Sequence, residues 1–240
     1  MSRPIVDEPG EVALRVRSLS RGFAGVAAVQ DLGFEVRRGE IFGLVGPDGA
    51  GKTSTLRMLA GVMRADAGSI ELDGIDVLAD PEAAKLHLSY MPQRFGLYED
   101  LSVGENIVFY AELFGVPRSR REARAGELLA AAGLAGFERR LAGTLSGGMK
   151  QKLGLVCALI HEPRVLLLDE PTTGVDPVSR RDFWEILYRL RDDGSPSSWP
   201  PPTWTKPSAA PGWLCCMPGA CACAIPREVS SRPCPARCSA

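Results

Sequence analysis

The chain has 240 residues, of which 45% are hydrophobic and 24% are charged, a composition typical of globular proteins. Its formal net charge is −1, so we expect no nucleic-acid partner, because binding to phosphate backbones depends on an excess of Lys and Arg. The first residues lack the apolar core of a signal peptide, and no window has the ~18 consecutive apolar residues of a membrane span. Any role at a membrane is therefore expected to act through a partner.

The N-terminal part predicts strands first and then a helix. Alternating apolar and polar residues over 13–19 and 32–39 predict a small antiparallel sheet. Residues 41–45, IFGLV, form a short apolar run before glycines, which is typical of a buried parallel strand. Apolar residues at helical spacing follow over 51–63.

The middle of the chain is predicted to be mainly helical. A hairpin signal, Asp73-Gly74, precedes a strand predicted over 88–93 that runs into a loop. Ser102 and Glu105 have the spacing of a capping box, which predicts the start of a helix. Helices are predicted over 102–114, 119–132 and 146–160.

A strand over 164–170 and a helix over 178–193, capped by Asp176-Pro177, complete the ordered part. Strands alternate with helices at both ends around the helical middle. This order predicts an α/β fold with a parallel core sheet, a small antiparallel β subdomain and an inserted helical subdomain. We expect one domain over residues 1–194, followed by a different segment over 195–240.

The strongest motif is GPDGAGKT, residues 46–53, which matches the phosphate-binding pattern G-x-x-x-x-G-K-[ST] between a strand and a helix. Glycines let backbone N–H groups surround phosphates, and the helix N-terminus adds partial positive charge. Lys52 is expected to reach the β- and γ-phosphates, and the Thr53 hydroxyl to bind Mg²⁺. The residues expected to bind the nucleotide here are Gly46, Pro47, Asp48, Gly49, Ala50, Gly51, Lys52, Thr53 and Ser54.

A second motif is VLLLDEP, residues 165–171. Its apolar run predicts a buried strand that brings a carboxylate to its carboxyl end, where ligands bind in such sheets. Asp169 is expected to hold Mg²⁺ through water, and Glu170 to polarise the attacking water. The two motifs together are compatible with many nucleotide enzymes.

The segment LSGGMKQKL, residues 145–153, narrows the choice. Its L-S-G-G-x-x-Q pattern resembles the signature motif of ATP-binding subunits of ABC transporters, and the resemblance covers roughly residues 11–194. In that family, the signature of one subunit closes over ATP bound to the other. The resemblance therefore implies that Ser146, Gly147 and Gly148 bind the nucleotide of a partner cassette.

Other positions match the family in order. Gln93 resembles the Q-loop glutamine that contacts Mg²⁺, Phe23 the aromatic residue that stacks on adenine, and Asp176 the D-loop aspartate. The resemblance implies ATP and Mg²⁺ as cofactors, with Thr53, Gln93 and Asp169 at the metal. It implies that Glu170, Gln93 and Lys52 act in catalysis.

The resemblance also implies partners: a transmembrane permease and a second cassette, in a homodimer or heterodimer at the cytoplasmic face of the cell membrane. The segments 101–116 and 171–184 look most like exporters of the ABC-2 type, which move drugs or lipids. Two alternatives stay open. One is a soluble ABC ATPase that acts on another machine, and the other is a truncated product that binds ATP with little hydrolysis.

One local departure is Asp48, which stands where the family usually has Asn. A carboxylate aimed at phosphates would repel them. We expect this side chain to point across the gap between two cassettes.

Residues 195–240 hold six of the seven cysteines and ten of the nineteen prolines, and they have no apolar strand and no histidine. The family has a strand here and then a switch histidine that contacts the γ-phosphate. We expect a low-complexity, disordered tail, with one edge of the core sheet left exposed. A zinc module fits poorly because the cysteines have C-C, C-x-C and C-x₃-C separations amid prolines. A disulfide scaffold conflicts with a cytoplasmic ATPase, and a proline-rich ligand segment is a further alternative.

A one-base slip of the reading frame near Gly194 offers another explanation of the tail. In the shifted frame, Trp199 and Trp204 become apolar, and Thr205 becomes Asp because Trp has a single codon. The restored string can read VTVLVATTYMDEAE, which resembles the family's switch strand and the start of the next helix. Pro202 occupies the switch-histidine position and cannot be restored to His.

Overall fold

The computed structural model describes residues 11–38, 40–191 and 212–216, with the backbone alone described at 189–191 and 212–216. The first of its two sheets is antiparallel. Its strands, in order across the sheet, are β2 (Val26–Arg37), β1 (Val12–Phe23), β4 (Ala67–Leu72) and β5 (Ile75–Asp76). The predicted antiparallel subdomain is confirmed.

Two tight turns close the hairpins of this sheet. Asp73 and Gly74 have φ of 50° and 80°, and Ala24 and Gly25 have φ of 47° and 82°. Two successive residues with positive φ are what a type I′ turn requires, and such turns match the twist of the paired strands. The hairpin predicted at Asp73-Gly74 is therefore confirmed, whereas the turn at Ala24-Gly25 was not predicted.

The second sheet is the core sheet. Its strands, in order, are β3 (Ile41–Leu44), β8 (Gly212–Cys216), β7 (Val165–Leu168) and β6 (Leu88–Met91). Strands β6 and β7 are parallel, with Leu88 opposite Val165. All four residues of β7 are buried, as an apolar strand covered on both faces should be.

Strand β8 is the part of the tail that the structure describes. Residues 212–216 are antiparallel to both β3 and β7, and the expectation of a low-complexity, disordered segment over 195–240 falls mostly on residues outside the described part of the chain. Strand β8 lies inside the sheet rather than leaving an exposed edge. The physical reason is that the facing edges of β3 and β7 carry buried backbone N–H and C=O groups that need partners. The zinc, disulfide and proline-rich readings fall mostly on residues outside the described part of the chain.

The helices follow the predicted caps. Ser102 and Glu105 form the capping box of α3 (Val103–Leu113), in which the Glu105 N–H donates to Ser102 Oγ and the Ser102 N–H donates to Glu105 Oε2 at 2.8 Å. Asp176 caps α6 by accepting hydrogen bonds from two N–H groups of its first turn. Two short helices were not predicted, α2 (Pro81–Lys85) and the 3₁₀ helix η1 (Ala142–Thr144). The other helices are α1 (Lys52–Leu59), α4 (Arg118–Ala132), α5 (Gly147–Leu159) and α6 (Pro177–Arg191).

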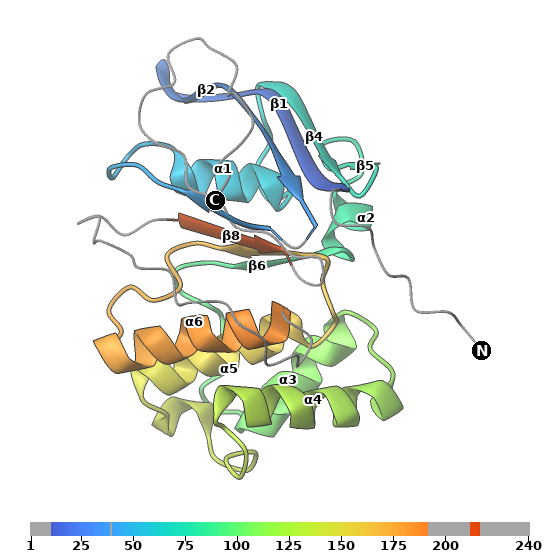
Figure 1. Cartoon of the computed structure of the whole chain (residues 1–240), viewed down its shortest axis with the longest axis vertical. Helices are drawn as coiled ribbons and strands as arrows, with labels where there is room; N and C mark the ends of the chain where they lie inside the picture. Colours follow the sequence, from blue (N-terminus) through green and yellow to red (C-terminus); the bar gives the residue numbers. More distant parts are fainter. Residues whose placement is uncertain (1–10, 39, 192–211, 217–240) are drawn as a thin grey trace.

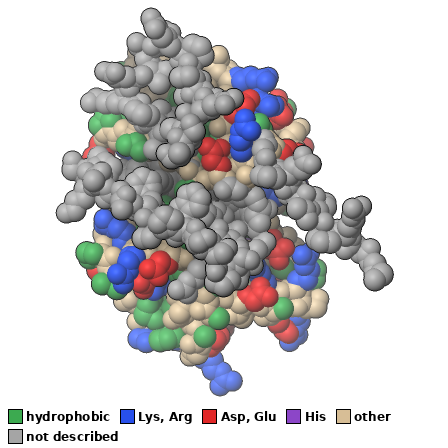
Figure 2. Space-filling view, viewed as in Figure 1, with side chains coloured by type: hydrophobic (Ala, Val, Ile, Leu, Met, Phe, Trp, Pro, Cys, Tyr) green, Lys and Arg blue, Asp and Glu red, His purple; other side chains and the backbone are tan. Residues whose placement is uncertain are grey.

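The elements stack in layers (Figure 1). Helix α1 lies between the antiparallel sheet and the core sheet, and α3, α4, α5 and α6 lie on the other side of the core sheet. Buried apolar residues from both sheets and from the helices form one continuous core. On the face seen in Figure 2, positive and negative side chains are interspersed. None of the helices in the described ranges has both the length and the apolar character that a bilayer span requires.

Candidate nucleotide-binding site

The loop between β3 and α1 has the geometry of a phosphate cradle. Gly49 and Gly51 have φ of 81° and 83°, a region that residues with a Cβ rarely adopt. A Cβ on Gly51 would also collide with the carbonyl oxygen of Ala28 and would lie 2.9 Å from Val29 Cγ2. The glycine is therefore required both by the backbone conformation and by the close approach of β2.

Lys52 is folded back onto this loop. Its Nζ donates to the carbonyl oxygens of Gly46 and Pro47 at 2.8 and 2.9 Å. The carboxylate of Asp48 lies 4.0 Å from the same ammonium group and is fully exposed to solvent. Phosphate oxygens can replace the two carbonyl oxygens as acceptors for Lys52, because all are hydrogen-bond acceptors and phosphate adds charge.

An open cavity of ≈ 240 Å³ lies over the loop. It is lined by residues 48–54, together with Phe23, Ala28 and Glu170. The ring of Phe23 is 43% exposed at the end of β1, and the Arg21 guanidinium lies 5.0 Å from its centroid. Phe23 therefore offers an exposed aromatic surface at the rim of the cavity.

Asp169 and Thr53 meet beside the loop. The Thr53 hydroxyl donates to Asp169 Oδ1 at 3.0 Å, and the carboxylate is buried. The Tyr90 hydroxyl donates to Asp169 Oδ2 at 3.1 Å. Burial, and then the charge of Asp169, raises the pKa of Tyr90 to about 12, so its hydroxyl keeps its proton. Sequence reasoning missed Tyr90 because tyrosine in a strand is ordinary β-sheet composition.

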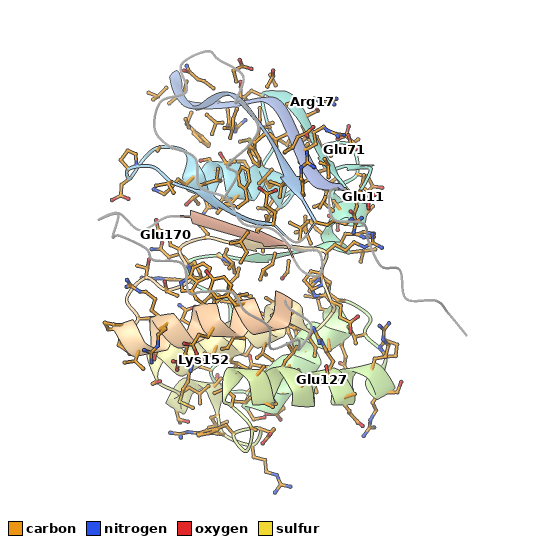
Figure 3. All side chains as sticks on the ribbon, viewed as in Figure 1. Glu11, Arg17, Glu71, Glu127, Lys152 and Glu170 are labelled. Atoms are coloured by element: carbon orange, nitrogen blue, oxygen red, sulfur yellow. The ribbon has the colours of Figure 1, made fainter. Side chains whose placement is uncertain are left out.

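Glu170 follows Asp169 at the end of the core sheet (Figure 3). Its φ is 49°, an unusual value for a residue with a side chain, and such backbone values concentrate at functional sites. Gln93 Nε2 lies 3.4 Å from Glu170 Oε2, and the Thr173 hydroxyl donates to the same oxygen at 3.2 Å. The loops after β6 and β7 thus bring Gln93 next to Glu170, which lines the cavity.

The predicted signature residues lie elsewhere. Ser146 caps α5 by accepting a hydrogen bond from Met149 N–H, and Gly147 and Gly148 begin that helix. Hydrogen bonds, first from Ser179 N–H, lower the pKa of Asp176, which caps α6. Within the described part of the chain, these four residues do not line the cavity. One copy of the chain therefore brings together the phosphate loop, Phe23, Gln93, Asp169 and Glu170, but not the signature.

Hard oxygen ligands suit Mg²⁺, and Thr53 and Asp169 provide a hydroxyl and a carboxylate oxygen beside one another, while the amide of Gln93 lies next to Glu170. The buried Asp169 carboxylate has hydroxyl donors but no cationic partner among the hydrogen bonds described here. The residues present therefore fit a magnesium ion that carries a nucleotide.

Comparisons with known proteins agree with this geometry. A sequence model of the family "ABC transporter" matches residues 29–173. The probable multidrug ABC transporter ATP-binding protein YbhF of Escherichia coli (strain K12) is 47% identical over 191 residues, which are 79% of this chain and 33% of that protein. The doxorubicin resistance ATP-binding protein DrrA of Mycobacterium tuberculosis (strain ATCC 25618 / H37Rv) is 39% identical over 173 residues, which are 72% of this chain and 52% of that protein.

Solved structures show the same similarity. An ATP binding subunit of an ABC transporter has a TM-score of 0.67 and 32% identity, and the match covers 76% of this chain and 75% of that one. The cbiO1 protein of Clostridium perfringens has a TM-score of 0.69 at 23% identity and supports the fold alone. The chain spans about a third to a half of the length of the two sequence relatives named above. The family match and the extent of these identities establish that the chain belongs to the ABC transporter family, as a cassette of its ATP-binding type.

Proposed function

We propose that this chain binds and hydrolyses ATP as the motor subunit of an ABC transporter of the ABC-2 exporter type. The observation that carries the proposal is that Lys52, Thr53 and Glu170 line one open cavity, and that Thr53 is hydrogen-bonded to Asp169. Relatives named for multidrug transport and for doxorubicin resistance support drugs as the substrate class.

Binding of ATP would begin at the phosphate loop. The N–H groups at the start of α1 face the phosphates, and Lys52 exchanges the carbonyl oxygens of Gly46 and Pro47 for phosphate oxygens. The exposed ring of Phe23 gives the adenine a stacking surface. Asp48 is exposed and solvent-screened, so its repulsion of the phosphates is expected to be weak.

Thr53, Gln93 and Asp169 would hold Mg²⁺ at the phosphates. When bound, the ion neutralises charge that develops on the transferred phosphoryl group. Glu170 would then orient the attacking water and accept its proton, because its carboxylate lines the cavity. Gln93, next to Glu170, links this step to the loop after β6.

The position of the signature supports a two-chain mechanism. Ser146, Gly147, Gly148 and Asp176 lie outside the cavity of their own chain, so they are available to close a cavity on a second cassette. Closure and reopening of such a pair would move a permease at the cytoplasmic face of the membrane. The chain would therefore act as a homodimer or heterodimer that is attached to the membrane through its permease.

The proposal is tested by equilibrium binding of ATP with Mg²⁺ and by steady-state release of phosphate. Lys52→Ala should weaken ATP binding about tenfold to a hundredfold, since a charge-assisted hydrogen bond contributes about 1.5–3 kcal/mol. Glu170→Gln should leave binding intact and lower the hydrolysis rate about a hundredfold or more. Absence of ATP binding by the unmodified chain would refute the proposal.

Two alternatives make different predictions. A soluble ABC ATPase without a transport role would not co-purify with a permease from its own cells. A product that binds ATP with little hydrolysis is favoured by the missing switch histidine, because His87 and His161 are the only histidines and both precede residue 194. Rapid steady-state hydrolysis that Glu170→Gln abolishes would exclude this second alternative.

We further propose that residues 195–240 form a separate segment translated out of frame with residues 1–194. The antiparallel direction of β8 supports this idea, since β3 and β7 both run with their carboxyl ends toward the phosphate loop. A chain in the family frame would supply a parallel strand at that position. Sequencing the coding DNA tests the proposal, and a single well-supported frame through Gly194 would refute it.

A further inference from the structure

Tyr90 has a contact that the ATP-binding motifs do not account for. It lies on β6, opposite Leu167 of β7 in the parallel register. Successive side chains of a strand point to opposite faces, so Leu167 and Asp169 share the face on which Tyr90 lies. The Tyr90 hydroxyl therefore reaches Asp169 across the pair of strands and donates to Oδ2 at 3.1 Å.

The carboxylate of Asp169 is held at both oxygens. Thr53 from α1 donates to Oδ1 at 3.0 Å, and Tyr90 from β6 donates to Oδ2. The backbone N–H of Asp169 also donates to Met91 O at 2.9 Å, so main chain and side chain are both tied to β6. A hydroxyl that gives a lone pair to a metal ion can still donate its proton, so Thr53 and Tyr90 can both hold the carboxylate when the ion is bound. Of the two donors, Tyr90 is the one that would not itself contact the ion.

Arg57 also acts on the Tyr90 hydroxyl, since its positive charge opposes the rise in the pKa of Tyr90. It lies four residues after Thr53 on α1, and its side chain interacts with Tyr90. A hydroxyl can donate one hydrogen bond and accept two, so donation to Asp169 and acceptance from Arg57 are compatible. The Tyr90 hydroxyl thus hydrogen-bonds to Asp169 after β7 and also interacts with Arg57 of α1.

We infer that Tyr90 is a positioning residue for the magnesium site, which orients the Asp169 carboxylate without touching the metal or the nucleotide. The inference rests on the proposed function. Groups that hydrogen-bond to metal-binding side chains typically change metal affinity tenfold to a hundredfold when removed. Tyr90→Phe removes one oxygen atom and keeps the ring, so the packing between β6 and its neighbours should persist.

The chain offers a matched control. Tyr110 on α3 is also half-buried, and its hydroxyl donates to Gly96 O at 2.7 Å. Burial raises the pKa of Tyr110 to about 12, as it does for Tyr90. Tyr110→Phe therefore removes a comparable hydrogen bond that does not involve Asp169.

The experiment measures binding of a fluorescent ATP analogue to the full chain, first in EDTA and then over a titration of MgCl₂. Mn²⁺ in place of Mg²⁺ allows the bound ion to be counted directly by electron paramagnetic resonance. For Tyr90→Phe we expect unchanged binding in EDTA and about a tenfold increase in the concentration of Mg²⁺ or Mn²⁺ at half-saturation. Tyr110→Phe should match the unmodified chain in both measurements.

Three results would overturn the inference. The first is a folded Tyr90→Phe protein, checked by circular dichroism and melting temperature, with unchanged metal dependence. The second is an equal loss of binding with and without metal, which would indicate a general structural role. The third is a full further effect of Tyr90→Phe in an Asp169→Asn background, where no carboxylate remains to orient. Failure of the unmodified chain to bind the nucleotide at all would instead refute the proposed function, and this inference with it.

Discussion

Replacing Gly148 by Ala should destabilise the contact between α5 and α6. A Cβ at this position would lie 2.6 Å from Ser179 Cβ and would overlap Ser179 Oγ, whereas the contact with Val175 Cγ1 at 3.7 Å would be ordinary. Carbon atoms attract best at about 3.5–4.0 Å, so one of the two helices must move by about 1 Å. Ser179 cannot move freely, because its N–H donates to Asp176 Oδ1 at 2.9 Å.

Overpacked sites in proteins typically lower the free energy of unfolding by about 1–3 kcal/mol, and we expect a loss in this range for Gly148→Ala. For a chain of this size, a loss of about 2 kcal/mol lowers the melting temperature by about 4–8 °C. Urea unfolding and thermal melts followed by circular dichroism would measure both quantities. Gly147→Ala is the matched control, since a Cβ there would meet nothing within 4 Å.

A second variant tests the cause of the loss. Ser179→Gly removes both atoms that the new methyl group would meet. The pair Gly148→Ala and Ser179→Gly should therefore be more stable than Gly148→Ala alone, after allowing about 0.5–1 kcal/mol for glycine in a helix. If Gly148→Ala has the same melting temperature as Gly147→Ala and the unmodified chain, then packing does not require a glycine at position 148. Its role would then have to be sought in the partner nucleotide alone.

Three further predictions concern residues away from the cavity. Burial lowers the pKa of His161 to about 4, so unfolding takes up a proton between pH 6.5 and 4. The free energy of unfolding therefore decreases as the pH is lowered through that range. In urea titrations, the loss of unfolding free energy between pH 7 and pH 4 should be about 2–3 kcal/mol smaller for His161→Gln than for the unmodified chain. Equal losses in the two proteins would contradict the assignment. Asp73→Asn should destabilise the chain by about 2 kcal/mol in the same assay, because the buried Asp73 pairs with Arg38 at 2.7 Å and Arg164 at 2.8 Å. Burial raises the pKa of the Cys157 thiol, so mass spectrometry should find Cys157 alkylated at pH 8 only after unfolding.

Local sequence patterns predicted much of the fold because each has a local cause. The capping box of α3 and the turn at Asp73-Gly74 depend on residues within a few positions of one another. The phosphate loop likewise depends on its own glycines. Helix α2 was missed because a helix of this length has few residues in which a period can show.

The missed part of the site depends on contacts between distant segments. Tyr90 and Asp169 are brought together by the register of β6 on β7, and no spacing in the sequence encodes that register. Gly148 is similar: a glycine at a helix start indicates an anion site, but its tight contact with Ser179 depends on how α5 packs against α6. Side chains that act through another element are therefore the ones that sequence reasoning missed.

The position and the direction of β8 affect ATP binding and ATP hydrolysis differently. Strands β3 and β7 are second neighbours, so a strand between them keeps their carboxyl ends about two strand spacings, or ~10 Å, apart. A strand of either direction satisfies the facing backbone groups, and Thr53 accordingly reaches Asp169 at 3.0 Å with β8 antiparallel.

The direction of β8 matters for the loop that follows the strand. Leu44 and Leu168, at the carboxyl ends of β3 and β7, lie opposite Gly212 and Trp213, so β8 starts at the cavity and runs away from it. A parallel strand would end at the cavity and bring its following loop to the γ-phosphate. Within the described residues, the groups expected to bind ATP are therefore together, whereas β8 brings no loop that follows it to the cavity. We therefore expect these residues to support ATP binding more fully than hydrolysis.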